Sequence, residues 1–170
     1  PEVALKYFQR ALQVDPSFTY AHTLCGHELA NNEDLDKAIQ SFRSSLHHDE
    51  RHYNAWYGLG SVFFRQEKYE MAEYHFRRAL AINSVSSVLR CYLCMSLHEQ
   101  NDEVKSAEAL DILMVACKVD PKNCQLHYQR AHLLLGQDLY EEAIEALEVV
   151  LTLAPKEPPV YSMLGTACLY

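Results

Sequence analysis

The amino-acid sequence predicts an all-α protein, an α-solenoid in which antiparallel helical hairpins stack into a right-handed superhelix. Alanine recurs at positions 4, 38, 72, 109 and 143, at intervals of 34, 34, 37 and 34 residues. A second series of mostly small residues interleaves with the first, and its members are Gly26, Gly60, Cys94, Ala131 and Gly165. Two series with a common period indicate one supersecondary unit that is repeated along the chain.

Large apolar residues follow each alanine by four positions, and they are Phe8, Phe42, Phe76, Leu113 and Leu147. Small residues on the first helix of a hairpin (helix A) and on the second (helix B) allow the two backbones to approach closely, while the large residue fills the space beside them. We therefore expect Gly60 to lie close to Ala72. We also expect Trp56 to pack against the preceding helix B, near Phe42 and Leu46.

The 34-residue period is that of tetratricopeptide repeats (TPRs), which are helical hairpins. Prolines at 16, 121 and 155 end three of the helices B, because proline cannot continue a helix. We predict a single TPR array over residues 1–170, a fragment of a longer superhelix. It comprises a helix B at 1–16, repeats at 19–52, 53–86, 87–123 and 124–157, and a partial repeat at 158–170. The three additional residues of the third repeat are expected to lengthen the turn between its helices, around 99–105.

Composition restricts the classes of partner. The 170-residue chain is 49% hydrophobic and 22% charged, which argues against disorder. No apolar stretch approaches the roughly 20 residues that a membrane span needs, so we expect no membrane partner. The formal net charge of −8 disfavours nucleic acid, because phosphate binding requires clustered Lys and Arg. Six cysteines without a secretory signal fit reduced thiols, and no sequence motif calls for a cofactor.

Several local strings resemble one family of TPR proteins, subunit three of the anaphase-promoting complex (cyclosome), also called the cell division cycle protein 27 family. They are YAHTLCGHE at 20–28, HYNAWYGLG at 52–60 and RQEKYEMAEYHFRRAL at 65–80, and the similarity extends to 86–89 and 120–123. The match covers nearly the whole chain and resembles the C-terminal TPR block of that family. Sister subunits share AWYGLG and GHE, so another TPR subunit of the same complex stays open as an alternative.

The resemblance implies a non-catalytic scaffold in a cell-cycle ubiquitin ligase of the nucleus and cytoplasm, with catalysis in other chains. In that family the C-terminal superhelix receives the C-terminal Ile-Arg tails of activator proteins and of a small core subunit, and it contacts other TPR subunits. The resemblance also implies that the full-length protein forms a homodimer through N-terminal repeats that this sequence does not contain.

Helices A of a TPR array line a concave groove, so their solvent-facing residues are the candidates for contact with an extended peptide. In the second hairpin, Asn54 can hydrogen-bond to a peptide backbone and Arg65 can pair with a terminal carboxylate. Tyr57 and Phe64 can enclose an aliphatic side chain. The other candidates are Ser61 in the same hairpin, Tyr20, Thr23 and His27 in the first, Cys91 and Met95 in the third, Tyr128 and His132 in the fourth, and Glu28 or Glu99 as partners for a ligand guanidinium.

Other interpretations are weaker. One alternative is that the polar candidates on helices A only keep the groove hydrated and bind no peptide. A co-chaperone TPR that clamps acidic C-terminal tails needs Lys and Arg along helices A, and the candidate positions offer mainly Arg65. Cys91, Cys94 and His98 have the spacing of one helix face and form a partial zinc set, but a fourth ligand is missing and Cys94 occupies the small packing position. We predict no metal site and no catalytic residues.

Overall fold

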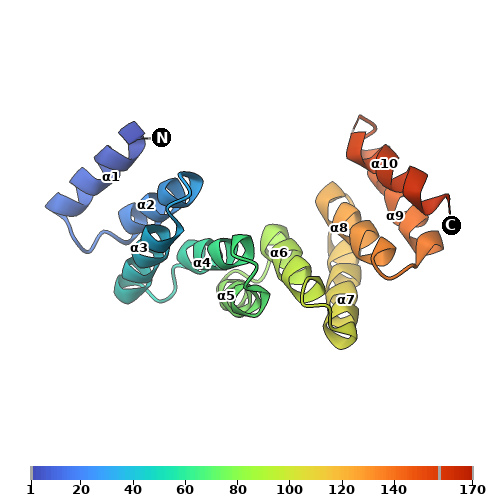
Figure 1. The fold of residues 1–170 in the computed structure, drawn as a ribbon, viewed down its shortest axis with the longest axis horizontal. Helices are drawn as coiled ribbons and strands as arrows, with labels where there is room; N and C mark the ends of the chain where they lie inside the picture. Colours follow the sequence, from blue (N-terminus) through green and yellow to red (C-terminus); the bar gives the residue numbers. More distant parts are fainter. Residues whose placement is uncertain (1, 157, 170) are drawn as a thin grey trace. The chain divides into compact units, whose positions relative to one another are not determined.

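The structure, a computed structural model, describes residues 2–156 and 158–169. Over these ranges the backbone forms ten α-helices and no strand (Figure 1), which confirms the all-α fold class. The helices are α1 Glu2–Val14, α2 Thr19–Asn31, α3 Leu35–His48, α4 Tyr53–Arg65, α5 Tyr69–Ile82, α6 Ser87–His98, α7 Glu103–Val119, α8 Cys124–Leu135, α9 Tyr140–Leu153 and α10 Pro158–Ala167. Within the described residues, no helix combines the length and the apolarity required to cross a bilayer.

The chain divides into two compact units, residues 1–89 and 90–170. In the first unit, α2 packs on α3 and α4 packs on α5, and these two hairpins are joined by contacts of α3 with α4 and of α2 with α4. In the second unit, α8 packs on α7, α9 and α10, and α9 packs on α10. Within each unit the first helices of successive hairpins therefore lie beside one another, as in a helical TPR solenoid.

Close packing in the first unit depends on glycine residues that face phenylalanine rings. Phe42 of α3 has no exposed surface, and its ring stands against Gly26 of α2 and Gly58 of α4, where an added β-carbon would clash with it. At Gly60 of α4 an added β-carbon would lie 2.6 Å from Cε1 of Phe76 of α5. The predicted complementarity of small and large positions is confirmed here, because each ring fills the space that the missing side chain leaves.

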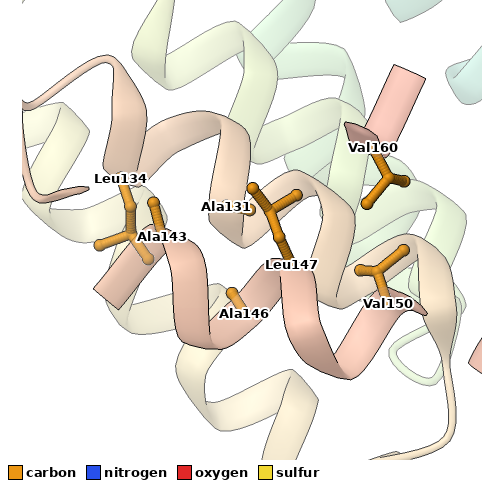
Figure 2. Packing of buried hydrophobic residues seen from close by; sticks show 7 residues of the cluster. All are labelled: Ala131, Leu134, Ala143, Ala146, Leu147, Val150 and Val160. Atoms are coloured by element: carbon orange, nitrogen blue, oxygen red, sulfur yellow. The ribbon is translucent and has the colours of Figure 1, made fainter. Parts of the chain in front are cut away.

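An apolar cluster holds α8, α9 and α10 together in the second unit. Figure 2 shows its side chains between the three helices, and they are Ala131, Leu134, Ala143, Ala146, Leu147, Val150 and Val160. Full burial of a leucine or valine side chain contributes roughly 1.5–3 kcal/mol. The alanines allow the backbones of α8 and α9 to approach, and Leu147 fills the space one turn further along α9.

The third hairpin differs from the prediction. Its helix α7 has 17 residues, whereas α3, α5 and α9 have 14 each. The turn that precedes α7 spans 99–102, one residue longer than the turn at 32–34. The turn at 136–139 has the same length, and α7 begins three residues earlier relative to Ala109 than α9 does relative to Ala143. The additional residues therefore extend α7 at its start, and the expectation that they lengthen the turn is wrong. Asp102 caps the helix at this point, since its Oδ1 accepts a hydrogen bond of 3.0 Å from the Lys105 amide.

Each turn from helix A to helix B contains a non-glycine residue in the left-handed region. The residues are Glu33, Glu67, Asn101 and Asp138, with φ of 65°, 59°, 54° and 59°. In the second hairpin the Lys68 amide donates to the Phe63 carbonyl at 2.9 Å, and equivalent bonds from Asp34 and Leu139 close two other turns. This hydrogen-bond pattern satisfies the last carbonyls of helix A, and it usually employs glycine at the left-handed position.

Trp56 contacts helix B of its own hairpin. Its ring centroid lies 5.6 Å from that of His75 and 6.4 Å from that of Tyr74, both on α5, and the Arg78 guanidinium carbon is 4.9 Å from the ring centroid. The expected packing against the preceding helix B, near Phe42 and Leu46, stays a prediction. The indole N–H needs an acceptor and donates to the Glu50 carbonyl at 2.8 Å, which keeps the half-buried ring at the edge of the hairpin.

Candidate functional site

The predicted groove residues of α4 share one face of that helix. Asn54, Tyr57, Ser61 and Phe64 are spaced by three or four residues, and all four are half-buried. The Asn54 amide makes no hydrogen bond with the described residues, so it can offer a donor and an acceptor to a peptide backbone. Ser61 contributes less, because its hydroxyl oxygen is buried without a hydrogen-bond partner among the described residues.

His27 of α2 brings a second helix A to this face. Its ring centroid lies 6.3 Å from that of Tyr57 and 5.0 Å from that of Phe42, with an edge-on geometry to Phe42. Burial lowers the pKa of His27, against the opposing effect of the neighbouring Glu28 carboxylate, so the imidazole is neutral near pH 7. Tyr20, at the start of α2, is 51% exposed. The structure therefore brings His27 and Tyr57 together as an aromatic wall.

Arg65 is engaged inside the first unit. Its Nη1 donates to the Ala30 carbonyl of α2 at 2.7 Å, and its Nη2 lies 2.5 Å from Oε1 of Glu33. The guanidinium thus ties the end of α4 to the end of α2 and satisfies a terminal carbonyl of that helix. The ion pair remains accessible, since the Arg65 and Glu33 side chains are 39% and 77% exposed.

Two predicted groove residues do not face solvent. Thr23 is 2% exposed, and its hydroxyl lies 2.8 Å from the Ser45 hydroxyl of α3. Cys91 is 4% exposed, and burial raises the pKa of its thiol to about 11. The expectation that both side chains face the groove is wrong, because small residues at this repeat position pack between helices A and B. The larger Tyr57 at the same position of α4 remains half-buried.

Glu28 follows His27 on α2, and its carboxylate raises the His27 pKa against the larger effect of burial. Glu28 is half-buried and occupies the repeat position at which Val62, Ser96 and Leu133 are buried. Glu33, which the sequence analysis did not select, forms an ion pair with the groove residue Arg65.

In the second unit, Tyr128 borders a hollow of about 470 Å³ between α8, α9 and α10. Its lining includes Asn123, Gln125, Tyr128, Val150, Pro159 and Val160. The sequence analysis missed Gln125, although it occupies the repeat position of Asn54 and carries the same amide group.

The other candidates of the second unit are dispersed. His132 is exposed, with its ring centroid 6.3 Å from that of His98. Met95 and Glu99 are half-buried near the end of α6. Burial lowers the pKa of His98, and the Glu99 carboxylate opposes this shift.

The sulfur of Cys94 lies 3.4 Å from the Ala109 carbonyl of α7, which fits a packed thiol. Among residues 2–156 and 158–169, no group of three or more His, Cys, Asp or Glu side chains is arranged to hold a metal ion.

Comparisons with known proteins agree with the repeat. The family model described as the cytochrome c-type biogenesis protein H TPR domain matches residues 4–161. Anaphase-promoting complex subunit 3 of Schizosaccharomyces pombe is 40% identical over 162 residues, which cover 95% of this chain and 24% of that protein. Cell division cycle protein 27 homolog B of Arabidopsis thaliana is 48% identical over 164 residues, which cover 96% and 22%. The chain thus spans about a quarter of the length of these relatives.

Solved structures show the same fold. A MamA fragment from Desulfovibrio magneticus RS-1 superimposes with a TM-score of 0.80 at 20% identity, over 93% of this chain and 88% of that one.

Proposed function

We propose that this chain is a non-catalytic scaffold of the anaphase-promoting complex, a ubiquitin ligase. The chain belongs to the TPR-domain family whose model matches residues 4–161, and to the cell division cycle protein 27 family of subunits of that complex. Its helices A hold the C-terminal Ile-Arg tails of activator proteins and of a small core subunit. Its other surfaces contact further TPR subunits of the complex. It acts in the nucleus and the cytoplasm, within a full-length protein that dimerises through N-terminal repeats.

The α4 face is the observation that supports this proposal. A side-chain amide without an internal partner is suited to an extended peptide, because Asn54 can pair with one N–H and one C=O of the ligand backbone. The rings of Tyr57 and His27 provide an apolar wall nearby for the isoleucine side chain.

The Arg65–Glu33 ion pair is suited to a ligand that ends in arginine. Such a ligand carries a carboxylate and a guanidinium on its last residue, and the pair offers it one charge of each sign. The terminal carboxylate binds beside Arg65 and the ligand guanidinium beside Glu33. Both side chains are exposed enough to be reached without opening the hairpins.

Calorimetric titration with three peptides tests the proposal. The peptides end in Ile-Arg with a free carboxylate, in Ile-Arg with an amidated terminus, and in Glu-Glu-Val-Asp. We expect the first to bind most tightly, since the amide removes the charge that pairs with Arg65. Preference for Glu-Glu-Val-Asp would instead favour the co-chaperone interpretation, and absence of binding to all three would remove the assignment.

Asn54→Ala is the matched variant. It is expected to weaken Ile-Arg binding about tenfold, which corresponds to the loss of one or two hydrogen bonds of about 1 kcal/mol each. Gln9→Ala, which removes an exposed amide from α1, is the control and should bind like the unmodified chain. Equal affinity of Asn54→Ala and Gln9→Ala, with equal helicity by circular dichroism, would contradict the role of Asn54.

A further inference from the structure

A hollow of the first unit lies beside the helices B. We call it the α3–α5 groove, and it is lined by Ile39, Arg43, Phe63, Gln66, Lys68 and Met71, with a volume of about 470 Å³. Its walls come from α3, from the end of α4 and from the start of α5. None of these residues belongs to the α4 face that carries Asn54 and Tyr57, so the two surfaces are distinct.

The floor of the groove is apolar. Phe63 is 4% exposed, and its ring stacks on His75 at 5.1 Å with an angle of 7° between the planes. Met71 is 44% exposed at the edge, and Ile39 is half-buried on the opposite wall. An exposed methionine beside partly covered aliphatic and aromatic surface can adapt its shape to an incoming apolar side chain.

The walls of the groove carry a net positive charge. Arg43 is exposed and makes no hydrogen bond or ion pair with the described residues. Lys68 donates to Gln66 Oε1 at 3.0 Å, which is a neutral acceptor. Asp36 also lines the groove and opposes these two charges, so the groove is net positive in a chain with a formal charge of −8. A cationic hollow in an acidic protein attracts anionic groups selectively.

Positively charged and aromatic side chains also lie beyond the groove, along α5. Arg43 faces His75, whose Nδ1 is buried without a hydrogen-bond partner among the described residues. His75 in turn contacts Trp56, over which the Arg78 guanidinium lies at 4.9 Å from the ring centroid. Ring contacts therefore link the groove floor at Phe63, through His75, to Trp56 and the exposed Arg78 guanidinium.

We propose that the α3–α5 groove binds an acidic peptide segment of a partner protein. A glutamate or aspartate of the segment lies between Arg43 and Lys68, and a neighbouring aliphatic side chain packs on Phe63 and Met71. The lining residues lie on α3, at the end of α4, in the turn that follows it and at the start of α5, away from Asn54 and Tyr57. The segment can therefore bind while the helices A hold another peptide.

Fluorescence anisotropy with a fluorescein-labelled peptide, Glu-Glu-Leu-Glu-Glu-Leu, tests the proposal. Its C-terminus is amidated so that it offers no terminal carboxylate to the helices A. We expect saturable binding that weakens about tenfold in Arg43→Glu and weakens as salt rises from about 50 to about 300 mM. Met71→Glu, which places a carboxylate over the apolar floor, is expected to weaken binding to a similar extent.

Lys122→Glu is the matched control, because it reverses an exposed cation of the second unit that lies outside the groove. It should bind the acidic peptide like the unmodified chain, and Arg43→Glu should still bind the Ile-Arg peptide. Absence of saturable binding, equal binding by Arg43→Glu, or equal weakening by Lys122→Glu would each overturn the proposal. Since the Ile-Arg titration is a separate measurement, failure here leaves the helix A assignment intact.

Discussion

Replacement of Gly60 by alanine should destabilise the chain, although alanine is the better helix former. The added β-carbon would lie 2.6, 2.7 and 2.9 Å from Cε1, Cδ1 and Cζ of Phe76. The ring has no exposed surface and cannot withdraw without moving its neighbours, such as Tyr57 at 6.1 Å between ring centroids. Overpacking of this kind costs about 1–3 kcal/mol, and alanine recovers about 1 kcal/mol of helix propensity. Because the clash is with a fully buried ring, we expect a net loss of about 2 kcal/mol.

Urea unfolding followed by circular dichroism at 222 nm measures this loss. Gly165→Ala is the matched control: Gly165 belongs to the same small-residue series, but no atom lies within 4 Å of its added β-carbon. It should be neutral or stabilise by up to about 1 kcal/mol. In a Phe76→Leu background, Gly60→Ala should cost at least about 1 kcal/mol less than it does alone. Equal effects of the two glycine substitutions would refute the close approach of α4 and α5.

Three further predictions concern the first unit. Glu67→Gly should raise the free energy of unfolding by about 1 kcal/mol, because φ of Glu67 is 59° and a side chain is strained there; no gain in urea unfolding would contradict this. Burial and, to a smaller extent, the Arg43 charge lower the pKa of His75 from 6.5 to about 4. As pH falls, His75 therefore binds a proton in the unfolded chain before it does so in the folded chain. The free energy of unfolding is therefore unaffected by His75 above pH 6.5 and falls by about 2–3 kcal/mol between pH 6.5 and 4. His75→Phe should flatten that part of the pH profile of unfolding. An unchanged profile would contradict the burial of His75. Arg65→Met should lower the free energy of unfolding by about 1 kcal/mol, because the Ala30 carbonyl loses its charged donor and keeps the Glu33 amide at 3.2 Å; wild-type stability would show that the Arg65 bond contributes nothing.

The periodicity of small and large residues predicted the packing of the hairpins, because close packing of each hairpin requires small and large residues at fixed positions. Gly26 and Gly60 must leave room for the rings of Phe42 and Phe76, so the same constraint recurs in the sequence of both hairpins. The additional residues of the third repeat were placed correctly between Cys94 and Ala109. Their conformation was not predicted correctly, because a longer turn and a longer helix both fit the same spacing. The position at which Asp102 caps the helix decides between the two.

The groove residues were harder to predict, because spacing gives the direction of a side chain and not its depth. Thr23 and Tyr57 share one repeat position, yet the small side chain is buried and the large one is half-buried. The partner of Arg65 could not be found either, since Glu33 lies 32 residues away in a turn. The left-handed conformation of that turn is not marked by glycine, which is the usual sequence signal.

A crystal structure of the chain with a peptide that ends in Ile-Arg is the most direct test of binding by the helices A. We predict that the Asn54 amide pairs with the peptide backbone and that the terminal arginine lies at the Arg65–Glu33 pair. A peptide seated on the helices B, with Asn54 left to solvent, would contradict that assignment.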